Sequence, residues 1–198
     1  GGYLAYVIPP SMNNGAYFNN LRKYIISNTN IEYMEIIEDS GTFTGATQKV
    51  MILILKKGEN KGNYIFNKGD LTIFSTKAEE LNICFKGKQT LKELGFVVKT
   101  GSIVWNQNKD ILTNDPKQSN LLIWAHNIQN NKLELCNNKK PQYIKSNNYN
   151  TFDAILVNRI TGSSNDAHIR AVLIKGQKWL AENHVNVIYK TNKCKYNL

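Results

Sequence analysis

The sequence predicts an α/β segment over residues 1–58, followed by a mixed α+β, strand-rich region over residues 59–198. Three observations lead to this fold class. The first part contains three apolar runs of strand length and one helical stripe, which is typical of α/β structure. The second part contains many shorter apolar runs separated by Gly and Asn turn signals. The net positive charge of the chain also lies downstream of residue 56.

The first part is expected to begin with a strand and a helix. Residues 3–9 form an apolar run without alternation, which is typical of a strand covered on both faces, as in a parallel sheet. Phe18, Leu21 and Ile25 follow at spacings that place them on one face of a helix. The polar residues 28–30 end this pattern.

Two further strands are expected at residues 31–37 and 49–55, joined by the polar turn at 38–45. The order strand, helix, strand, strand matches the edge of a doubly wound α/β domain. A turn this short allows the last strand to run antiparallel to its neighbour.

Charge divides the chain into a neutral part and a cationic part. Residues 1–56 hold four Lys+Arg and four Asp+Glu, whereas residues 57–198 hold 21 and 11. A basic excess confined to one region is the electrostatic footprint of a protein that binds a polyanion, because each cation near a phosphate releases counterions. The alternative is the solvated surface of a Lys-rich protein. The same shift predicts a domain boundary near residues 56–63.

The second part is expected to be built from short strands and turns. Strands are predicted at residues 64–67, 71–75, 96–99, 103–105, 121–125, 143–144 and 154–157, with short helices at 76–81 and 90–94. Residues 167–174 and 177–183 fit a strand or a helix equally well. The polar, Lys-rich stretch at 137–150 is expected to be a loop.

Composition argues against several classes of protein. Cys84, Cys136 and Cys194 are widely spaced, which favours reduced thiols in a cytoplasmic protein over a disulfide framework. No apolar run approaches the ~20 residues that a membrane span needs. The three histidines have no metal-ligand spacing, and no Ser/His/Asp arrangement is visible. We therefore expect no metal and no membrane partner.

Several segments resemble adenine-specific DNA methyltransferases of type II restriction–modification systems. They are residues 1–9, Asn14-Gly15, Leu21-Arg22 and 48–56 in the first part, and 98–109, 121–124, Asn127-Ile128 and 182–186 in the second. Together they span most of the chain. The resemblance implies that residues 1–58 are the C-terminal part of a Rossmann-like methyltransferase catalytic domain. It also implies that residues 59–198 form a target-recognition domain for double-stranded DNA.

Two motifs of that family do not occur in this chain. The family binds S-adenosylmethionine through a Gly-rich turn between a strand and a helix, and it holds the target adenine with an Asn/Asp-Pro-Pro-Tyr/Phe tetrapeptide. Residues 8–11, Ile-Pro-Pro-Ser, have the prolines but neither flanking residue. We therefore expect a C-terminal fragment that begins mid-fold, has no catalytic residue and binds no cofactor alone. Its second expected partner is the missing N-terminal half, which would bind S-adenosylmethionine.

Phe43 is the predicted base-stacking residue. It lies in the turn Gly41-Thr-Phe-Thr-Gly45, and the resemblance places there an aromatic ring that stacks on the flipped adenine. An extruded base needs flat apolar surfaces to replace its lost stacking, and a ring between two glycines can reach it. The alternative is an aromatic loop residue packed against the sheet.

The segment from Lys99 to Lys109 is the first predicted DNA contact. Gly101 allows close approach of a backbone, hydroxyl groups on either side of it can bond phosphate, and three successive amides at 106–108 can recognise adenine edges. The contact residues predicted here are Lys99, Thr100, Ser102, Asn106 and Lys109. Trp105 could stack on a base, but a tryptophan beside Ile103 and Val104 is more often a core residue.

The segment from Arg159 to Arg170 is the second predicted contact. The chain has only three arginines, and two of them bracket this Gly/Ser-containing loop. A guanidinium group is a planar fork that matches phosphate or guanine. The contact residues predicted here are Arg159, Ser163, Ser164 and Arg170. Alternatively, one of the arginines pairs with Asp166 and fixes the loop.

Two other functions remain open on the sequence alone. The chain could be a stand-alone nucleic-acid-binding module, for which the cationic region suffices. It could also be a DNA-specificity or interaction subunit without catalytic activity, in which strands 3–9 and 49–55 dock onto a partner chain. Glu182-Asn183-His184 is expected to be structural, with Asn183 capping or bonding backbone.

Overall fold

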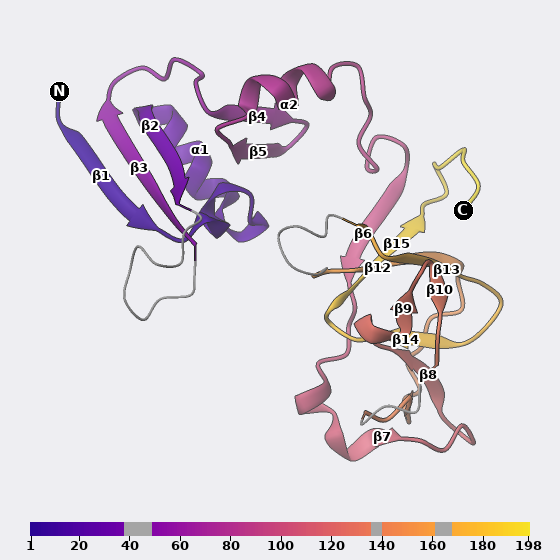
Figure 1. Cartoon of the computed structure of the whole chain (residues 1–198). Coiled ribbons are helices and arrows are strands. Elements are labelled where there is room, and N and C mark those ends of the chain that lie inside the picture. Colours follow the sequence, from indigo (N-terminus) through magenta and orange to yellow (C-terminus); the bar gives the residue numbers. More distant parts are fainter. Residues whose placement is uncertain (38–48, 136–139, 161–167) are drawn as a thin grey trace. The chain divides into compact units, whose positions relative to one another are not determined.

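The computed structural model describes residues 1–37, 49–135, 140–160 and 168–198 (Figure 1). The chain divides into two compact units, Gly1–Thr90 and Leu91–Leu198. Over the described residues the fold is mixed α+β and strand-rich, and it contains two α-helices. None of the described helices is long and apolar enough to cross a membrane.

Three strands and one helix form the body of the first unit. The strands are β1 (Tyr3–Ile8), β2 (Thr29–Ile37) and β3 (Val50–Lys57), and α1 (Asn19–Asn28) lies between β1 and β2 in the chain. β3 is the central strand and pairs antiparallel with both others, so β1 and β2 run parallel to each other. These elements lie where the sequence predicts them, and the antiparallel last strand is confirmed.

Helix α1 covers one face of this sheet (Figure 1). Two 3-10 turns, η1 (Pro10–Asn13) and η2 (Ala16–Phe18), precede it. Ile25 is buried and Phe18 packs against the same core, as the helical stripe predicts, but Leu21 is 45% exposed. The apolar side chains that α1 meets on the sheet are Ile31, Met34, Met51, Leu53 and Leu55.

β1 is an exposed edge strand, contrary to the expectation of a strand covered on both faces. Tyr3 is 62% exposed and Val7 is 60% exposed, and only Ile8 is partly buried. The apolar run is suited to burial on both faces, but the described chain supplies β3 on one edge and α1 on one face only. Among the described residues, nothing covers the outer edge of β1 or its face opposite α1.

Residues 59–90, which the charge shift assigned to the second part, fold with the first unit. They form a hairpin of β4 (Ile65–Lys68) and β5 (Leu71–Phe74), followed by α2 (Ala78–Cys84). Ile65 and Phe74 pack into the core beneath α1, which is why the compact units divide after Thr90 rather than near residue 58. The helix expected at 90–94 is a turn, because the chain bends at Gly95, where φ is +87°.

A buried arginine ties α1 to this hairpin. Arg22 is fully buried, and its Nε donates to the carbonyl of Thr72 on β5 at 2.6 Å. Its Nη1 donates to the carbonyls of Met12 at 2.7 Å and Gly15 at 2.9 Å. Burial lowers the pKa of this guanidinium, but an arginine stays charged at neutral pH. Its bonds to carbonyls offset the cost of burying that charge.

Two four-stranded sheets form the second unit. The first has the order β13 (Ala171–Ile174), β12 (Ala154–Asn158), β15 (Val185–Lys190), β6 (Phe96–Thr100), with antiparallel neighbours throughout. The second has the order β14 (Trp179–Ala181), β8 (Asn120–Ile123), β11 (Tyr143–Ile144), β7 (Leu112–Thr113), in which β14 runs parallel to β8. The ambiguous stretches 167–174 and 177–183 contain strands, not helices.

Short elements complete the second unit. They are a hairpin of β9 (Ile128–Gln129) and β10 (Lys132–Leu133), and the 3-10 turns η3 (Trp105–Gln107), η4 (Lys109–Ile111) and η5 (Ala125–Asn127). The strand expected at 103–105 is not formed, since Ile103 makes one isolated bridge to Glu182 and η3 begins at Trp105.

β8 is buried along its whole length and serves two apolar clusters of the second unit. Ile123 packs with Leu156 and Trp179 in the larger cluster, whereas Leu122 packs with Trp124 in the smaller one. Alternate residues of a strand point to opposite faces, so one continuous apolar run fills both clusters.

Replacing Arg22 with Met should lower the free energy of unfolding of the first unit by about 3 kcal/mol, because three carbonyls lose their donor. All three tryptophans lie in the second unit, so tryptophan fluorescence cannot report this loss. Hydrogen exchange of the α1 and β5 amides measures it directly. Lys23→Met, on the exposed side of the same helix, is the matched control and should leave these exchange rates unchanged. Equal protection in both variants would contradict the structural role of Arg22.

Candidate nucleic-acid interface

The register of the first sheet of the second unit brings three predicted DNA contacts to one end. Asn158 is opposite Val185, Val157 is opposite Ala171, and Asn186 is opposite Thr100. Arg159 follows Asn158 and Arg170 precedes Ala171, so both arginines and Thr100 lie at this end of the sheet.

Backbone hydrogen bonds fix this end of the sheet. The N–H of Arg159 donates to the carbonyl of His184 at 2.9 Å, and the N–H of Asn158 donates to the carbonyl of Arg170 at 3.0 Å. We refer to Thr100, Arg159, Arg170 and His184 together as the arginine end. All four residues are exposed. Among the described residues, no carboxylate pairs with the Arg159 side chain.

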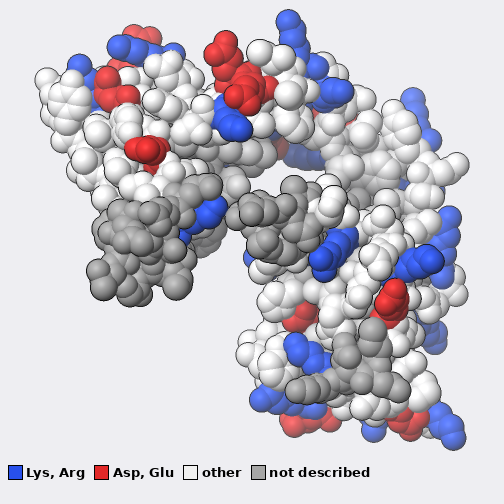
Figure 2. Space-filling model, viewed as in Figure 1, with Lys and Arg blue, Asp and Glu red and all other residues white. Residues whose placement is uncertain are grey.

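The second unit carries most of the positive charge. It holds 15 Lys+Arg and seven Asp+Glu, whereas the first unit holds ten and eight. Figure 2 shows Lys and Arg side chains at several places on the visible face of the second unit, with a few acidic side chains between them. Net charge therefore favours a polyanion but does not delimit a contact surface, which has to be defined by individual residues.

Gly101 permits a close backbone contact within the unit. The N–H of Gly101 donates to the carbonyl of Val185 at 2.8 Å. The N–H of Ile103 donates to the carbonyl of Ala181 at 3.1 Å. A Cβ on Gly101 would lie 2.2 Å from the carbonyl oxygen of Glu182. The backbone that approaches Gly101 thus belongs to this chain, and it holds Thr100 and Ser102 at the exit of β6.

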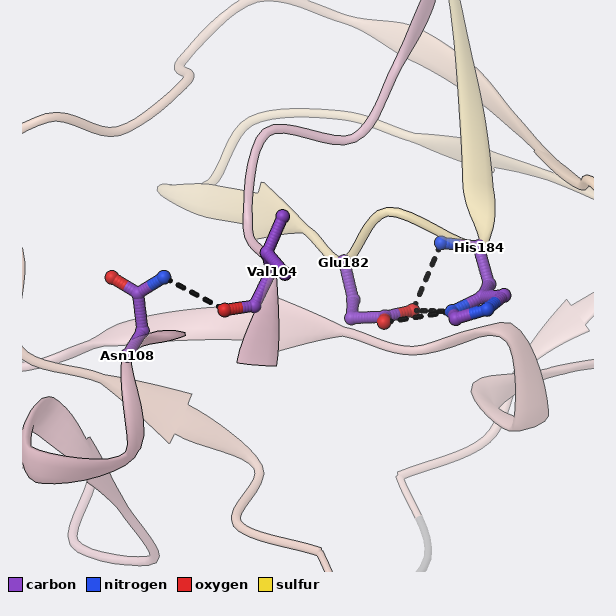
Figure 3. A network of polar contacts seen from close by, with 4 residues as sticks. All are labelled: Val104, Asn108, Glu182 and His184. Carbon is purple, nitrogen blue, oxygen red and sulfur yellow. Dashed lines mark hydrogen bonds and ion pairs between the residues drawn. The ribbon is translucent and has the colours of Figure 1, made fainter. Parts of the chain in front are cut away.

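Beside this contact, the buried carboxylate of Glu182 pairs with the exposed imidazole of His184 (Figure 3). Glu182 is 2% exposed, and its Oε1 lies 2.8 Å from Nδ1 of His184. Its Oε2 accepts the backbone N–H of His184 at 3.0 Å. The imidazole itself is 53% exposed, so Nδ1 is engaged with the carboxylate while the ring faces solvent. The sequence predicts a structural role for this segment, and the structure adds an exposed imidazole that is held by a buried carboxylate.

The side-chain amide of Asn108 bonds the backbone, and that of Asn183 has a buried oxygen. Nδ2 of Asn108 donates to the carbonyl of Val104 at 2.8 Å, which closes η3 and occupies this amide (Figure 3). Asn183 bonds backbone through its own N–H, which donates to the carbonyl of Ile103 at 2.9 Å. Its Oδ1 is buried without a partner among the described residues. Asn106, by contrast, is exposed on η3.

Trp105 lies in a group of cations rather than in the core. Its side chain is 37% exposed, which contradicts the core interpretation. The Nζ atoms of Lys109 and Lys140 each lie 5.3 Å from its ring centroid, at the distance of a cation–π contact. Lys140 also lies 4.6 Å from the ring of Trp124. No described carboxylate pairs with either lysine.

His126 stacks on the buried Trp124, with 6.0 Å between ring centroids and 19° between ring planes. Burial lowers the pKa of His126, the charge of Lys140 lowers it further, and the charge of Glu182 opposes both effects. A neutral His126 therefore adds no positive charge at neutral pH, and the cations of this group are the two lysines.

Arg170 borders a polar hollow of about 380 Å³ that the hairpin of β9 and β10 completes. Asn130 and Asn131 form the two-residue turn of this hairpin, with φ of +49° and +59°. Amide groups and arginine are the side chains that recognise adenine and guanine edges. These asparagines are not among the residues predicted from the sequence, because the short segments that flank them, Ile128-Gln129 and Lys132-Leu133, carry no clear strand pattern.

Several predicted residues cannot be placed. Phe43, Ser163, Ser164 and the alternative ion-pair partner Asp166 lie outside the described residues. Within the described residues, no group of three His, Cys, Asp or Glu side chains could hold a metal ion.

Comparisons with known proteins add no relative. No family model matches the chain, and no curated protein sequence matches it.

Replacing Gly101 with Ala should destabilise the second unit by about 2 kcal/mol or more, because the new Cβ overlaps a backbone carbonyl that cannot rotate away. Denaturant unfolding followed by tryptophan fluorescence reports this unit alone, since it contains all three tryptophans. Ser102→Ala is the matched control and should leave the midpoint unchanged, because Ser102 is exposed. A Gly101→Ala protein as stable as the control would contradict this contact.

The stability of the second unit should fall as the pH drops below about 6.5, the unperturbed pKa of histidine. The unfolded state binds the His126 proton near that pH, whereas the folded state binds it only at lower pH, so acid favours unfolding in this interval. Below both pKa values this contribution to stability is lost completely. The same fluorescence experiment at several pH values measures it, and His126→Gln should reduce the pH dependence. An unchanged profile in that variant would assign the effect to other groups.

Proposed function

We propose that the chain is the C-terminal part of a site-specific DNA adenine methyltransferase, in which the second unit recognises the DNA target. The main support for this proposal is the group of residues at the arginine end. It brings together two of the three arginines of the chain, an exposed hydroxyl group and an oriented imidazole in a unit with a large basic excess. Such a combination suits a phosphate backbone and the base edges beside it.

The roles of the residues follow from their chemistry. Arg159, Lys109 and Lys140, which pair with no carboxylate among the described residues, would contact phosphates. Arg170 borders the hollow with the amides of the β9–β10 turn, which suits contact with base edges in the major groove. Thr100 and Ser102 would bond phosphate oxygens from the exit of β6. Phe43, as the family resemblance implies, would form one wall of the pocket for the flipped adenine.

The first unit supports the proposal through its topology. β1 and β2 are parallel strands joined through α1, and antiparallel β3 lies between them. Doubly wound sheets are built from such crossovers and commonly carry an antiparallel strand near one edge. The open edge of β1 and its exposed apolar side chains suit pairing with further strands of a larger sheet. In this proposal the missing N-terminal half supplies those strands.

The described residues do not fit S-adenosylmethionine. A hollow of about 370 Å³ lies beside β1, but apolar side chains such as Leu4, Tyr6 and Leu21 line most of it. It contains no carboxylate of the kind that binds ribose hydroxyls. The proposal therefore assigns the cofactor and the methyl-transfer step to the missing half, and the present chain contributes recognition of DNA.

The exposure of β1 also favours one alternative over the other. A self-contained nucleic-acid-binding module has no need of an uncharged, uncovered edge strand, whereas a DNA-specificity subunit would cover it with a partner chain. Both alternatives use the same DNA surface. They differ from the methyltransferase proposal in whether the partner of β1 carries the cofactor motifs.

Neutralising Arg159, Arg170 and Lys109 together, each to Gln, should weaken binding to duplex DNA and flatten its salt dependence. Each phosphate contact contributes about 0.9 to the slope of log K against log salt, so the loss should approach 2 to 3 units. Fluorescence anisotropy of a labelled duplex, titrated at several salt concentrations, measures both quantities.

The matched control removes the same charge from the opposite end of the sheet. Lys175 follows β13, and Lys193 and Lys195 follow β15; all three are exposed. Their triple Gln variant should retain most of the slope. Equal losses in the two variants would show that only net charge matters, and no binding of the unaltered chain at low salt would refute the proposal.

A further inference from the structure

A second hollow lies at the exit of β6, on the face of the sheet that carries Val187 and Tyr189. Its volume is about 210 Å³. Phe152, Val187 and Tyr189 supply apolar surface, and Thr100, Ser102 and Asn150 supply polar groups. Lys99 also lines it. Lys99, Thr100 and Ser102 are predicted DNA contacts, but neither the resemblance nor the contacts described above assign a ligand to Asn150, Phe152 or Tyr189.

The aromatic rings of this hollow are fixed yet accessible. Phe152 packs edge-on against the buried Trp179, with 5.5 Å between centroids and 77° between planes. It also lies 4.9 Å from the ring of Tyr189. Even so, Phe152 is 42% exposed. A large apolar ring held by two neighbours and left open to solvent offers a flat surface to a planar ligand.

A cation lies beside these rings. Nζ of Lys99 is 5.8 Å from the centroid of Tyr189, and among the described residues no carboxylate pairs with it. Lys99 belongs to the segment that leads into Thr100 and Ser102, which the proposed function assigns to phosphate oxygens. A ligand with a planar ring and an attached phosphate would therefore meet complementary groups.

The size of the hollow limits the ligand further. Pockets for drug-sized molecules are commonly about 300 Å³ or larger. A hollow of about 210 Å³ therefore suits one ring system and not an extended ligand. The polar group at Asn150 can bond the edge of a base, which a purely apolar gap could not do.

We infer that this hollow binds a single unpaired nucleotide of a bound DNA, with its base on Phe152 and Tyr189 and its phosphate on Lys99. The inference rests on the proposed binding of DNA by the second unit. It adds that the unit prefers DNA in which a nucleotide has left the helical stack. Stacking on protein aromatic rings replaces the stacking that such a base has lost.

The experiment compares two duplexes with the full chain. One contains 2-aminopurine in a base pair, and the other contains it as an extra, unpaired nucleotide. We expect about tenfold tighter binding of the second duplex, together with quenching of its 2-aminopurine emission as the base stacks on the rings. Phe152→Leu, which keeps an apolar side chain but removes the ring, should abolish both effects and keep the affinity for the paired duplex.

Two further variants make the result decisive. Tyr196→Leu removes another exposed ring of the same unit and should change neither effect. Lys99→Gln should reduce the preference for the unpaired nucleotide. If Phe152→Leu does not fold, this variant and the emission of the wild-type complex test the inference without it.

The possible failures can be told apart. Equal affinities for the two duplexes, unquenched emission, or a preference that survives Phe152→Leu would overturn this inference and leave the proposed function standing. Absence of binding to both duplexes at low salt would overturn the proposed function as well.

Discussion

The constraint on which the second unit depends is the direct contact between the backbone at Gly101 and the turn that joins β14 to β15. That turn connects the two sheets of the unit, because β14 belongs to one and β15 to the other. Hydrogen bonds from Gly101 and Ile103 extend β6 along it. Only a residue without a Cβ allows this approach. The position of every proposed contact at the β6 exit follows from it.

Arginine serves two different purposes in a chain whose cations are mostly lysines. Arg22 is buried, and its planar fork satisfies three carbonyls from different segments, which a lysine could not do with the same geometry. Arg159 and Arg170 are exposed at one end of a sheet whose register is fixed by hydrogen bonds. In both places the geometry of the guanidinium group, rather than its charge alone, distinguishes the position from those that lysine occupies.

The local sequence pattern predicted where strands form better than it predicted which segments pack against them. The runs at 3–9 and 49–55 are strands, because strand length and apolar character are properties of a few adjacent residues. The exposure of β1 and the packing of the β4–β5 hairpin on α1 depend on distant segments, so the sequence placed the boundary too early. For the same reason the sequence does not show that Lys140, from a remote polar stretch, lies over the ring of Trp105 beside Lys109.

The lysines around Trp105 differ from the scattered surface lysines because their side chains are already held over an aromatic ring. A lysine on an open surface loses side-chain conformational freedom when it contacts a phosphate, and that loss weakens the contact. Lys109 and Lys140 are already positioned over indole rings, so less freedom remains to be lost. In the proposed function, scattered lysines would attract DNA to the unit by long-range charge, whereas the positioned cations and the two exposed arginines would determine where the DNA is held. Affinity for DNA and its orientation would then arise from different residues of the same basic unit.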